Sequence, residues 1–579
     1  MGLGDVLYTL ATCAFFMALV AIISYYKTRG AVDTRDGYFL AGRGLSGVFI
    51  AGSMLLTNLS AEQLIGLNGS AYGYNLSSMA WEVTASFAII IMALVFLPRY
   101  LSGAFSTLPE FLESRFDDGV RRLTVIMFMV GYGLITIPAV LYSGSVAVLR
   151  LFDMQALLGL GYSEALLVTI LLVGLVGSIY AVFGGLKAVA VSDTLNGVGL
   201  LIVGIAVPLF GFAALGGGDI WAGVKTITST HQEKLNAIGS AADPTPFATI
   251  FTGMIFANLF YWGTNQYVIQ RTLGASSLAE GQKGVLATGY FKLIVPLMMM
   301  IPGIIAFHLY GPGLVTIDMA YPRLVADVLP RFMSGFFLAV LLGAVFSSFN
   351  SLLNSAATLF CLDVYVPLRK GKVGDKELIR VAKIASIVVA LFSFITAPLL
   401  QYSPEGLFQI MRLFTGFYSI PIIAIVLVGL FTRHVPPQAA KIALLFHIIA
   451  YGVLNFVIDS GLHFIHVFGI LFVVQVVIML AMGRWHPLAT PWHYQRHEKV
   501  DMTPWRYALP VAVTLLSLIA MVYVLFSPIG VAGGPHPLFW EIIALIAAFN
   551  IVGWWLAMRY WQPRYVAHVQ AIGTDREKF

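Results

Sequence analysis

The chain has 579 residues, of which 59% are apolar and 11% are charged, whereas an ordinary soluble domain has about 25% charged residues. This composition excludes a string of soluble domains and predicts a polytopic membrane protein built as one helical bundle. The net charge of +6 does not indicate nucleic-acid binding, because the basic residues gather in loops on one side. Cys13 and Cys361 both lie in apolar runs, so neither a disulfide framework nor a zinc site is predicted.

Apolar stretches long enough to cross a bilayer, which takes about 20 residues per helix, follow one another along the whole chain. We expect fifteen such spans, at about 4–26, 45–71, 78–99, 122–149, 162–183, 190–214, 247–271, 284–308, 332–362, 378–400, 406–431, 438–459, 463–483, 507–527 and 538–560. The predicted fold class is therefore an all-α polytopic membrane protein with about 14–15 transmembrane helices.

Lysine and arginine gather in alternate loops, and such loops face the cytoplasm. The basic loops include 27–43, 99–122 and 484–506, whereas the loops at 401–405, 460–462 and 528–537 contain no lysine or arginine. No basic region precedes the first apolar run, which indicates a spanning helix rather than a cleaved signal peptide. We expect a multi-pass protein of the bacterial inner (plasma) membrane, with its N-terminus outside and its C-terminus inside.

The second expected span is polar at its centre, where it reads Thr57-Asn-Leu-Ser-Ala-Glu-Gln-Leu-Ile-Gly66. A bilayer core has no water to satisfy such groups, so this helix must face protein or a wet cavity. Secondary transporters break helices at mid-membrane in this way to bind solute and ion. The span 247–271 is interrupted similarly, at 258–266. Two broken helices about 200 residues apart indicate two halves of one repeat.

These features predict the division of the chain into inverted repeats that pivot around a central site. We expect an extra helix and first inner loop at 1–44, a first repeat at 45–214, an external loop at 215–246, a second repeat at 247–431, and extra helices with a cytoplasmic tail at 432–579.

Several motifs within residues 1–460 are similar to those of a known transporter family. They are Asn58–Gly66, Leu108–Phe116, Tyr180–Asp193, Ala257–Arg271, Lys292–Pro296, and Phe346–Ser348 with Asn354 and Ser355. Together they resemble the solute:sodium symporter family, close to bacterial sodium/galactose and animal sodium/glucose cotransporters. This resemblance implies a LeuT-type five-plus-five inverted repeat with extra helices, and a transporter rather than an enzyme.

Ser347 and Ser348 lie at the middle of the ninth span, one turn after Ala344. Hydroxyl oxygens and carbonyls freed at a broken helix suit a hard cation. The resemblance implies a sodium ion between Ala344, Ser347, Ser348 and the backbone carbonyls of Leu56 and Leu59. The paired serines could instead only allow close helix packing.

Asp193 is a carboxylate near the inner end of the sixth span. An intramembrane carboxylate is a candidate functional residue, so Asp193 could belong to a second sodium site or guide ion release. A helix cap or a salt bridge with Lys187 is the alternative.

Gln63, Glu82, Asn258 and Lys292 each lie within an otherwise apolar span. A sugar needs several convergent donors and acceptors, because unpaired polar groups are costly. The resemblance implies that these four residues bind the sugar. A structural ion pair for Glu82 and a snorkelling side chain for Lys292 are the alternatives.

Two aromatic residues complete the expected site. Tyr261 matches the residue that closes the sugar site from the inside in the family, although it could be a plain packing residue. Trp81 stands where the galactose symporter has a tyrosine, and could cover the outer side.

One position departs from the family pattern. Arg412 stands where the hexose transporters carry a glutamine that contacts sugar. An arginine inside a span favours an anion, and its fork suits a carboxylate, sulfonate or phosphate. An acidic or modified sugar is therefore an alternative substrate. Arg412 could equally pair with Glu82 or Glu405, or snorkel outward.

The sequence thus predicts a sodium-coupled symporter that imports a sugar, such as galactose or glucose, by alternating access. The same mechanism with an acidic or modified sugar, and a membrane sensor or channel, are the alternatives. The expected partners are the sugar, sodium and membrane lipid, with neither nucleic acid nor an obligate protein partner. No His-Glu-x-x-His pair or Ser/His constellation on facing spans predicts an enzyme.

Overall fold

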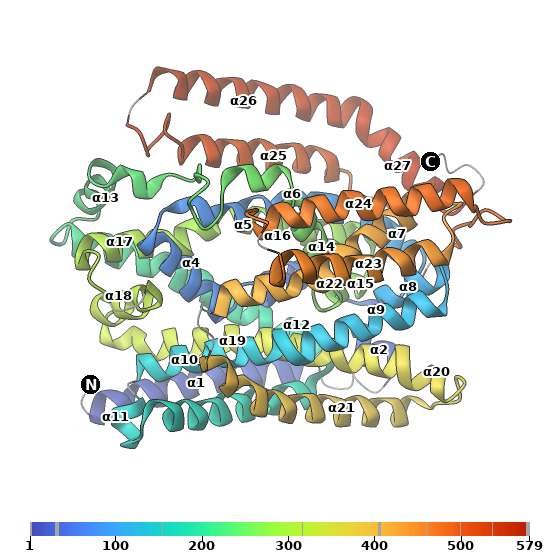
Figure 1. The fold of residues 1–579 in the computed structure, drawn as a ribbon. Coiled ribbons are helices and arrows are strands. Elements are labelled where there is room, and N and C mark those ends of the chain that lie inside the picture. The colour runs from blue at the N-terminus through green and yellow to red at the C-terminus, as the bar shows by residue number, and fades with distance from the viewer. Residues whose placement is uncertain are drawn as a thin grey trace.

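A computed structural model describes residues 3–28, 34–152, 154–314, 317–402, 407–458, 460–497, 499–534 and 536–574. Within these ranges the chain is helical apart from loops, and it forms two isolated β-bridges but no strand. The long helices run side by side, and the two termini lie at opposite ends of the bundle (Figure 1). The prediction of an all-α bundle is confirmed.

The helices fall into four groups along the chain. The N-terminal part contains α1 (Leu3–Thr28) and α2 (Arg35–Leu40). The expected first repeat contains α3 (Gly47–Asn58), α4 (Ala61–Gly73), α5 (Met79–Val83), α6 (Ala85–Ile91), α7 (Leu97–Ser102), α8 (Leu108–Arg115), α9 (Asp118–Gly131), α10 (Ile137–Leu151), α11 (Met154–Leu158) and α12 (Tyr162–Leu215). The external loop and expected second repeat contain α13 (Ile220–Ser229), α14 (Met254–Gly263), α15 (Gln266–Leu273), α16 (Leu278–Met299), α17 (Ile301–Tyr310), α18 (Ala320–Val328), α19 (Ser334–Thr358), α20 (Val366–Leu368), α21 (Asp375–Thr396) and α22 (Leu407–Phe431). The C-terminal part contains α23 (Pro437–Phe456), α24 (Phe464–Trp485), α25 (Ala508–Leu525), α26 (Pro537–Leu556) and α27 (Gln562–Ala571).

Short turns of other helical types join these elements. The π-helical turns are η3 (Met92–Phe96), η4 (Tyr132–Thr136), η9 (Leu359–Tyr365) and η11 (Ala557–Trp561). The 3-10 turns are η1 (Ala41–Arg43), η2 (Leu76–Ser78), η5 (Gln232–Leu235), η6 (Phe247–Phe251), η7 (Ile317–Met319), η8 (Arg331–Met333) and η10 (Ala397–Tyr402).

Twelve helices in the described part of the chain are long and apolar enough to cross a membrane, and the bent pair α3–α4 makes a thirteenth. The two other expected spans, 162–183 and 247–271, are also helical: they correspond to the first half of α12 and to the pair α14–α15. Each of the fifteen spans expected from the sequence is therefore found as helix.

The helical segment α12 covers two expected spans. If straight, its 54 residues would be roughly 80 Å long at 1.5 Å per residue. Gly177 nevertheless packs against Phe346 and Phe349 of α19, while Asn196 packs against Gly343, one turn away on the same helix. Both halves of the segment therefore contact the same part of α19, as expected for two separate spans.

Both predicted helix breaks are present. Between α3 and α4 the backbone leaves helical geometry at Leu59 and Ser60, and the two helices are bent by 60°. Between α14 and α15 it does so at Thr264 and Asn265. Here Tyr132 supplies replacement hydrogen bonds, since its hydroxyl donates to Asn265 Oδ1 (2.6 Å) and accepts from the Tyr267 amide (3.3 Å).

The last two long helices form an outer layer on one side of the bundle (Figure 1). α25 packs against α6 and α16, and α26 packs chiefly against α25. The outward face of α26 exposes Trp540, Leu545 and Ile551, which is typical of a helix that faces lipid.

Candidate functional site

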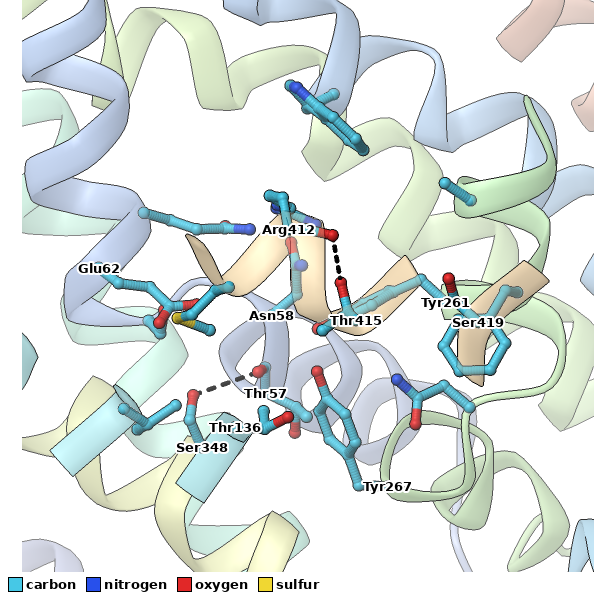
Figure 2. Close-up of a pocket in the computed structure, with 18 of the residues that line it drawn as sticks. Thr57, Asn58, Glu62, Thr136, Tyr261, Tyr267, Ser348, Arg412, Thr415 and Ser419 are labelled. Atoms are coloured by element: carbon cyan, nitrogen blue, oxygen red, sulfur yellow. Dashed lines mark hydrogen bonds between the residues drawn. The ribbon is translucent and has the colours of Figure 1, made fainter. Parts of the chain in front are cut away.

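A cavity is bounded by both helix breaks and by α22. It lies where the sequence predicted the solute site. Its lining residues are Thr57, Asn58, Ser60, Glu62, Gln63, Trp81, Thr136, Val140, Ala257, Asn258, Phe260, Tyr261, Asn265, Tyr267, Ser348, Leu352, Met411, Arg412, Thr415, Tyr418, Ser419 and Phe468. Figure 2 shows Glu62 and Tyr261 at opposite sides of the pocket view, with Arg412 between them and Tyr267 below Arg412.

Four of the six residues expected to bind the solute line the cavity, namely Gln63, Trp81, Asn258 and Arg412. Asn258 projects from α14 and donates to Thr84 Oγ1 at 3.0 Å. The expected gate residue Tyr261 also lines the cavity, where its ring contacts those of Trp262 and Tyr267. Their roles in binding and gating remain predictions.

The other two, Glu82 and Lys292, pair with each other behind the cavity wall. The exposed fractions of their side chains are 3% and 1%, and the Lys292 ammonium donates to Glu82 and to Asn58 Oδ1. The ammonium also lies 5.4 Å from the centre of the Trp262 ring. Because Asn58 lines the cavity, this side chain connects the buried pair to the solute space. Lys292 does not snorkel.

Arg412 reaches the cavity from α22. Its guanidinium carbon lies 4.6 Å from the centre of the Trp81 ring, a cation–π distance. Among the lining residues that the structure describes, Glu62 is the one carboxylate. Glu82 is occupied by Lys292, and Glu405 lies outside the described residues.

Of the expected sodium ligands, Ser348 of α19 contacts the end of α3 at the break. Ser348 Oγ donates to the Thr57 carbonyl at 3.2 Å, which places α19 against the broken end of α3. Ser347 Oγ is buried and has no hydrogen-bond partner within the described chain. Leu56, Leu59 and Ala344 are also buried. Buried hydroxyls and the carbonyls of a broken helix are the oxygen donors that a hard cation takes, so the chemistry of Ser347, Ser348 and the end of α3 fits sodium.

Asp193 forms part of a buried polar network next to Ser347. Its Oδ2 accepts from Ser53 Oγ of α3 at 2.7 Å, whereas its Oδ1 has no partner in the part of the chain described. Arg271, which is fully buried, donates to Ser53 Oγ at 3.1 Å and also to Ser351 of α19. Asp193 therefore bonds to Ser53 rather than to Lys187. Its place in a second sodium site stays a prediction.

Sequence reasoning did not select Glu62 as a site residue. It belongs to the polar stretch that marks the first helix break, so the signal was present, but the orientation of its side chain depends on how α4 leaves that break. The lining residues Thr415, Tyr418 and Ser419 were also missed, since they lie on an otherwise apolar helix.

Comparison with known proteins agrees with this geometry. Residues 38–446 match the sequence model of the sodium:solute symporter family. The uncharacterized symporter YidK of Escherichia coli (strain K12) is 43% identical over 520 residues, which cover 90% of this chain and 89% of that protein. The sodium/glucose cotransporter of Vibrio parahaemolyticus is 31% identical over 454 residues, which cover 74% of this chain and 81% of that protein.

Among solved structures, the substrate-bound outward-open state of a Na+-coupled sialic acid symporter has a TM-score of 0.71 and 22% identity, and covers 84% of this chain and 98% of that one. This likeness concerns the fold and confirms the predicted LeuT-type architecture. The match over most of the chain implies an integral multi-pass protein that couples sodium to a small-molecule solute. The chain belongs to the sodium:solute symporter family.

Proposed function

We propose that this symporter imports a sugar, such as galactose or glucose, by alternating access. The observation that carries the proposal is the cavity at the two helix breaks, where the amides of Gln63 and Asn258 lie with the aromatic rings of Trp81 and Tyr261. Amides both donate to and accept from hydroxyls, and aromatic faces cover the apolar side of a ring. The Vibrio relative, named a sodium/glucose cotransporter, supports the same substrate class.

Sodium would be held by Ser347 Oγ, Ser348 Oγ and the carbonyls of Leu56, Leu59 and Ala344, with Asp193 as the candidate for a second site. The unpartnered Ser347 hydroxyl supports this assignment. Each sodium that enters down 100 mV supplies about 2.3 kcal/mol, which concentrates a neutral solute roughly fiftyfold. No chemical step is required of the chain, so we assign it no enzymatic activity.

The proposed location is the bacterial inner membrane, with the N-terminus outside. The charge alternation of the loops supports this orientation, and the termini lie at opposite ends of the bundle (Figure 1).

A second candidate is the same sodium symport with an acidic or modified sugar. The observation in its favour is Arg412, a cation on the cavity wall that could form a bidentate pair with a carboxylate or sulfonate.

The test is uptake of labelled galactose and glucose into proteoliposomes, with an inward sodium gradient or with potassium in its place. Sodium-dependent uptake of either sugar, lost in Gln63→Ala and retained in the exposed control Gln495→Ala, is the expected result. Uptake of uronic acids but not of hexoses, abolished in Arg412→Gln, would favour the second candidate. Uptake that does not depend on sodium would overturn the proposal.

A further inference from the structure

One part of the cavity wall comes from α24, which follows the two expected repeats. Among the described lining residues, the buried Phe468 is the one that lies outside residues 38–446, the range that matches the family model. Phe472, one turn further along α24, is also buried but is not among the described residues that line the cavity. Its ring stacks on that of Phe256 at 3.6 Å. Within the described chain, α24 therefore presents the ring of Phe468 to the cavity.

Two glycines allow this ring to reach the cavity between α14 and α22. A Cβ atom on Gly416 of α22 would collide with the Phe468 ring, and a Cβ atom on Gly253, directly before α14, would lie 2.8 Å from Phe468 Cβ. Both helices carry cavity residues, such as Asn258 of α14 and Thr415 of α22 (Figure 2). Phe468 therefore fills the seam between two helices that bound the cavity.

The neighbours of Phe468 hold its ring in place. The ring lies edge-on to that of Phe464, with centroids 5.5 Å apart, and its centroid is 5.7 Å from that of Tyr451 of α23. The Tyr451 hydroxyl in turn donates to the Leu413 carbonyl of α22 at 2.7 Å. Because protein interiors are close-packed, a ring supported in this way cannot move aside for a larger solute without disturbing these contacts.

A second set of hydrogen bonds fixes α23 and α24 to α22. His447 of α23 is fully buried; its Nε2 donates to the Gly416 carbonyl at 3.0 Å, and its Nδ1 accepts from the Gln475 amide of α24 at 3.0 Å. Both ring nitrogens are therefore used, as in a neutral imidazole. Gly416 directly follows Thr415, which lines the cavity. The helices that carry Thr415 and Phe468 are thus held at a fixed separation.

We propose that Phe468 is a specificity-determining residue that limits the size of the solute. Its ring closes the cavity at the seam between α14 and α22 and is supported from behind, so a solute that extends past this seam meets a fixed wall. A hydrophobic pocket discriminates about 10–200-fold between solutes that differ by one methylene group, and an aromatic ring occupies far more space than that. This inference rests on the proposed function, because it takes the cavity as the solute site.

The test compares galactose with lactose, a disaccharide that contains galactose. Sodium-dependent uptake of labelled galactose into proteoliposomes is measured with unlabelled galactose or lactose as competitor, for the parent, Phe468→Ala and Phe468→Leu. Phe468→Leu is the milder change, because it leaves a large apolar side chain in the core. Phe472→Ala removes the same kind of ring from the same helix, away from the cavity, and is the matched control.

We expect lactose to compete weakly in the parent and in the control. The lactose concentration for half-inhibition, relative to that of galactose, should fall at least tenfold in Phe468→Ala and by a smaller factor in Phe468→Leu. An unchanged ratio in the folded Phe468 variants, an equal fall in Phe472→Ala, or a parent in which lactose competes as well as galactose would overturn the inference.

If the parent takes up no sugar with sodium, the proposed sugar transport fails, and the reactivity of a cavity thiol decides about Phe468. Thr415→Cys is made together with Cys13→Ala and Cys361→Ala, and is treated with a small or a bulky water-soluble methanethiosulfonate. Adding Phe468→Ala should raise the rate of the bulky reagent relative to the small one at least tenfold, and adding Phe472→Ala should not. An unchanged rate ratio with Phe468→Ala would overturn the size limit.

Discussion

The buried pair Glu82–Lys292 allows a quantitative prediction. Lys292→Met keeps the apolar stem beside Trp262 but removes the ammonium that bonds to Glu82 and Asn58. The carboxylate then remains in a site where 3% of the side chain is exposed. Breaking a buried pair by removing one partner costs about 3–5 kcal/mol, whereas replacing both charges is often close to neutral. We therefore expect Lys292→Met to destabilise the protein by about 4 kcal/mol, and the double variant Glu82→Gln, Lys292→Met by much less.

The free energy of unfolding in mixed detergent micelles, measured without sodium or solute, tests this order. Lys441→Met is the matched control, because Lys441 and Asp117 form a 2.5 Å pair whose side chains are 33% and 36% exposed, and such pairs contribute at most about 1 kcal/mol. A double variant as unstable as Lys292→Met would refute the reasoning, since the cost would not then come from an isolated buried charge.

Uptake by the same variants separates stability from binding. If Glu82 and Lys292 also bind the sugar, as the family resemblance implies, the double variant should fold well and still lose transport. Recovery of uptake together with stability would show that the pair has only a structural role.

Two further predictions concern the ion site and helix packing. Ser347→Ala removes a hydroxyl from the proposed sodium site, so it should raise the sodium concentration for half-maximal uptake about tenfold. Stability measured without sodium should stay unchanged. A sodium dependence equal to that of the control Ser86→Ala would contradict the assignment of Ser347 to the ion site. A Cβ atom on Gly303 of α17 would lie 2.0 Å from the Asn68 carbonyl oxygen of α4, so Gly303→Ala should lower the free energy of unfolding by about 1–3 kcal/mol by pushing these helices apart. The control Gly374→Ala, where a Cβ meets nothing within 4 Å, should leave stability unchanged. Equal melting temperatures for the two variants would argue against the close crossing.

The fold could be predicted well because the bilayer restricts the possibilities. Span length follows from membrane thickness, and polar residues in the middle of a span, as at Asn58 and Asn265, mark a helix break. The contacts between spans could not be predicted in the same way. The close approach of Gly303 to Asn68 depends on how two helices cross, which hydropathy does not encode.

The sequence indicated candidate site residues one by one, but it did not indicate which of them pair with each other. Glu82 and Lys292 are 210 positions apart, so the sequence predicted a solute contact for Glu82 and left an ion pair as the alternative. Neighbouring positions on a helix point about 100° apart. Gln63 and Glu62 therefore could not both be assigned to the cavity until the direction of α4 after the break was known.

The same helix break borders the solute cavity and would contribute carbonyls to the proposed ion site, and such an arrangement would link the two affinities. Thr57 lines the cavity and its carbonyl accepts from Ser348. Two residues further on, Leu59 ends the helical geometry, and the next residue, Ser60, also lines the cavity. An ion held by the carbonyls of Leu56 and Leu59 would fix the backbone that presents Glu62 and Gln63 to the solute. Such coupling is reciprocal: if sodium raises solute affinity by some factor, the solute must raise sodium affinity by the same factor. Because the connection is only a few residues of backbone, we expect it to survive changes at Arg412 and to be lost when the break itself is altered.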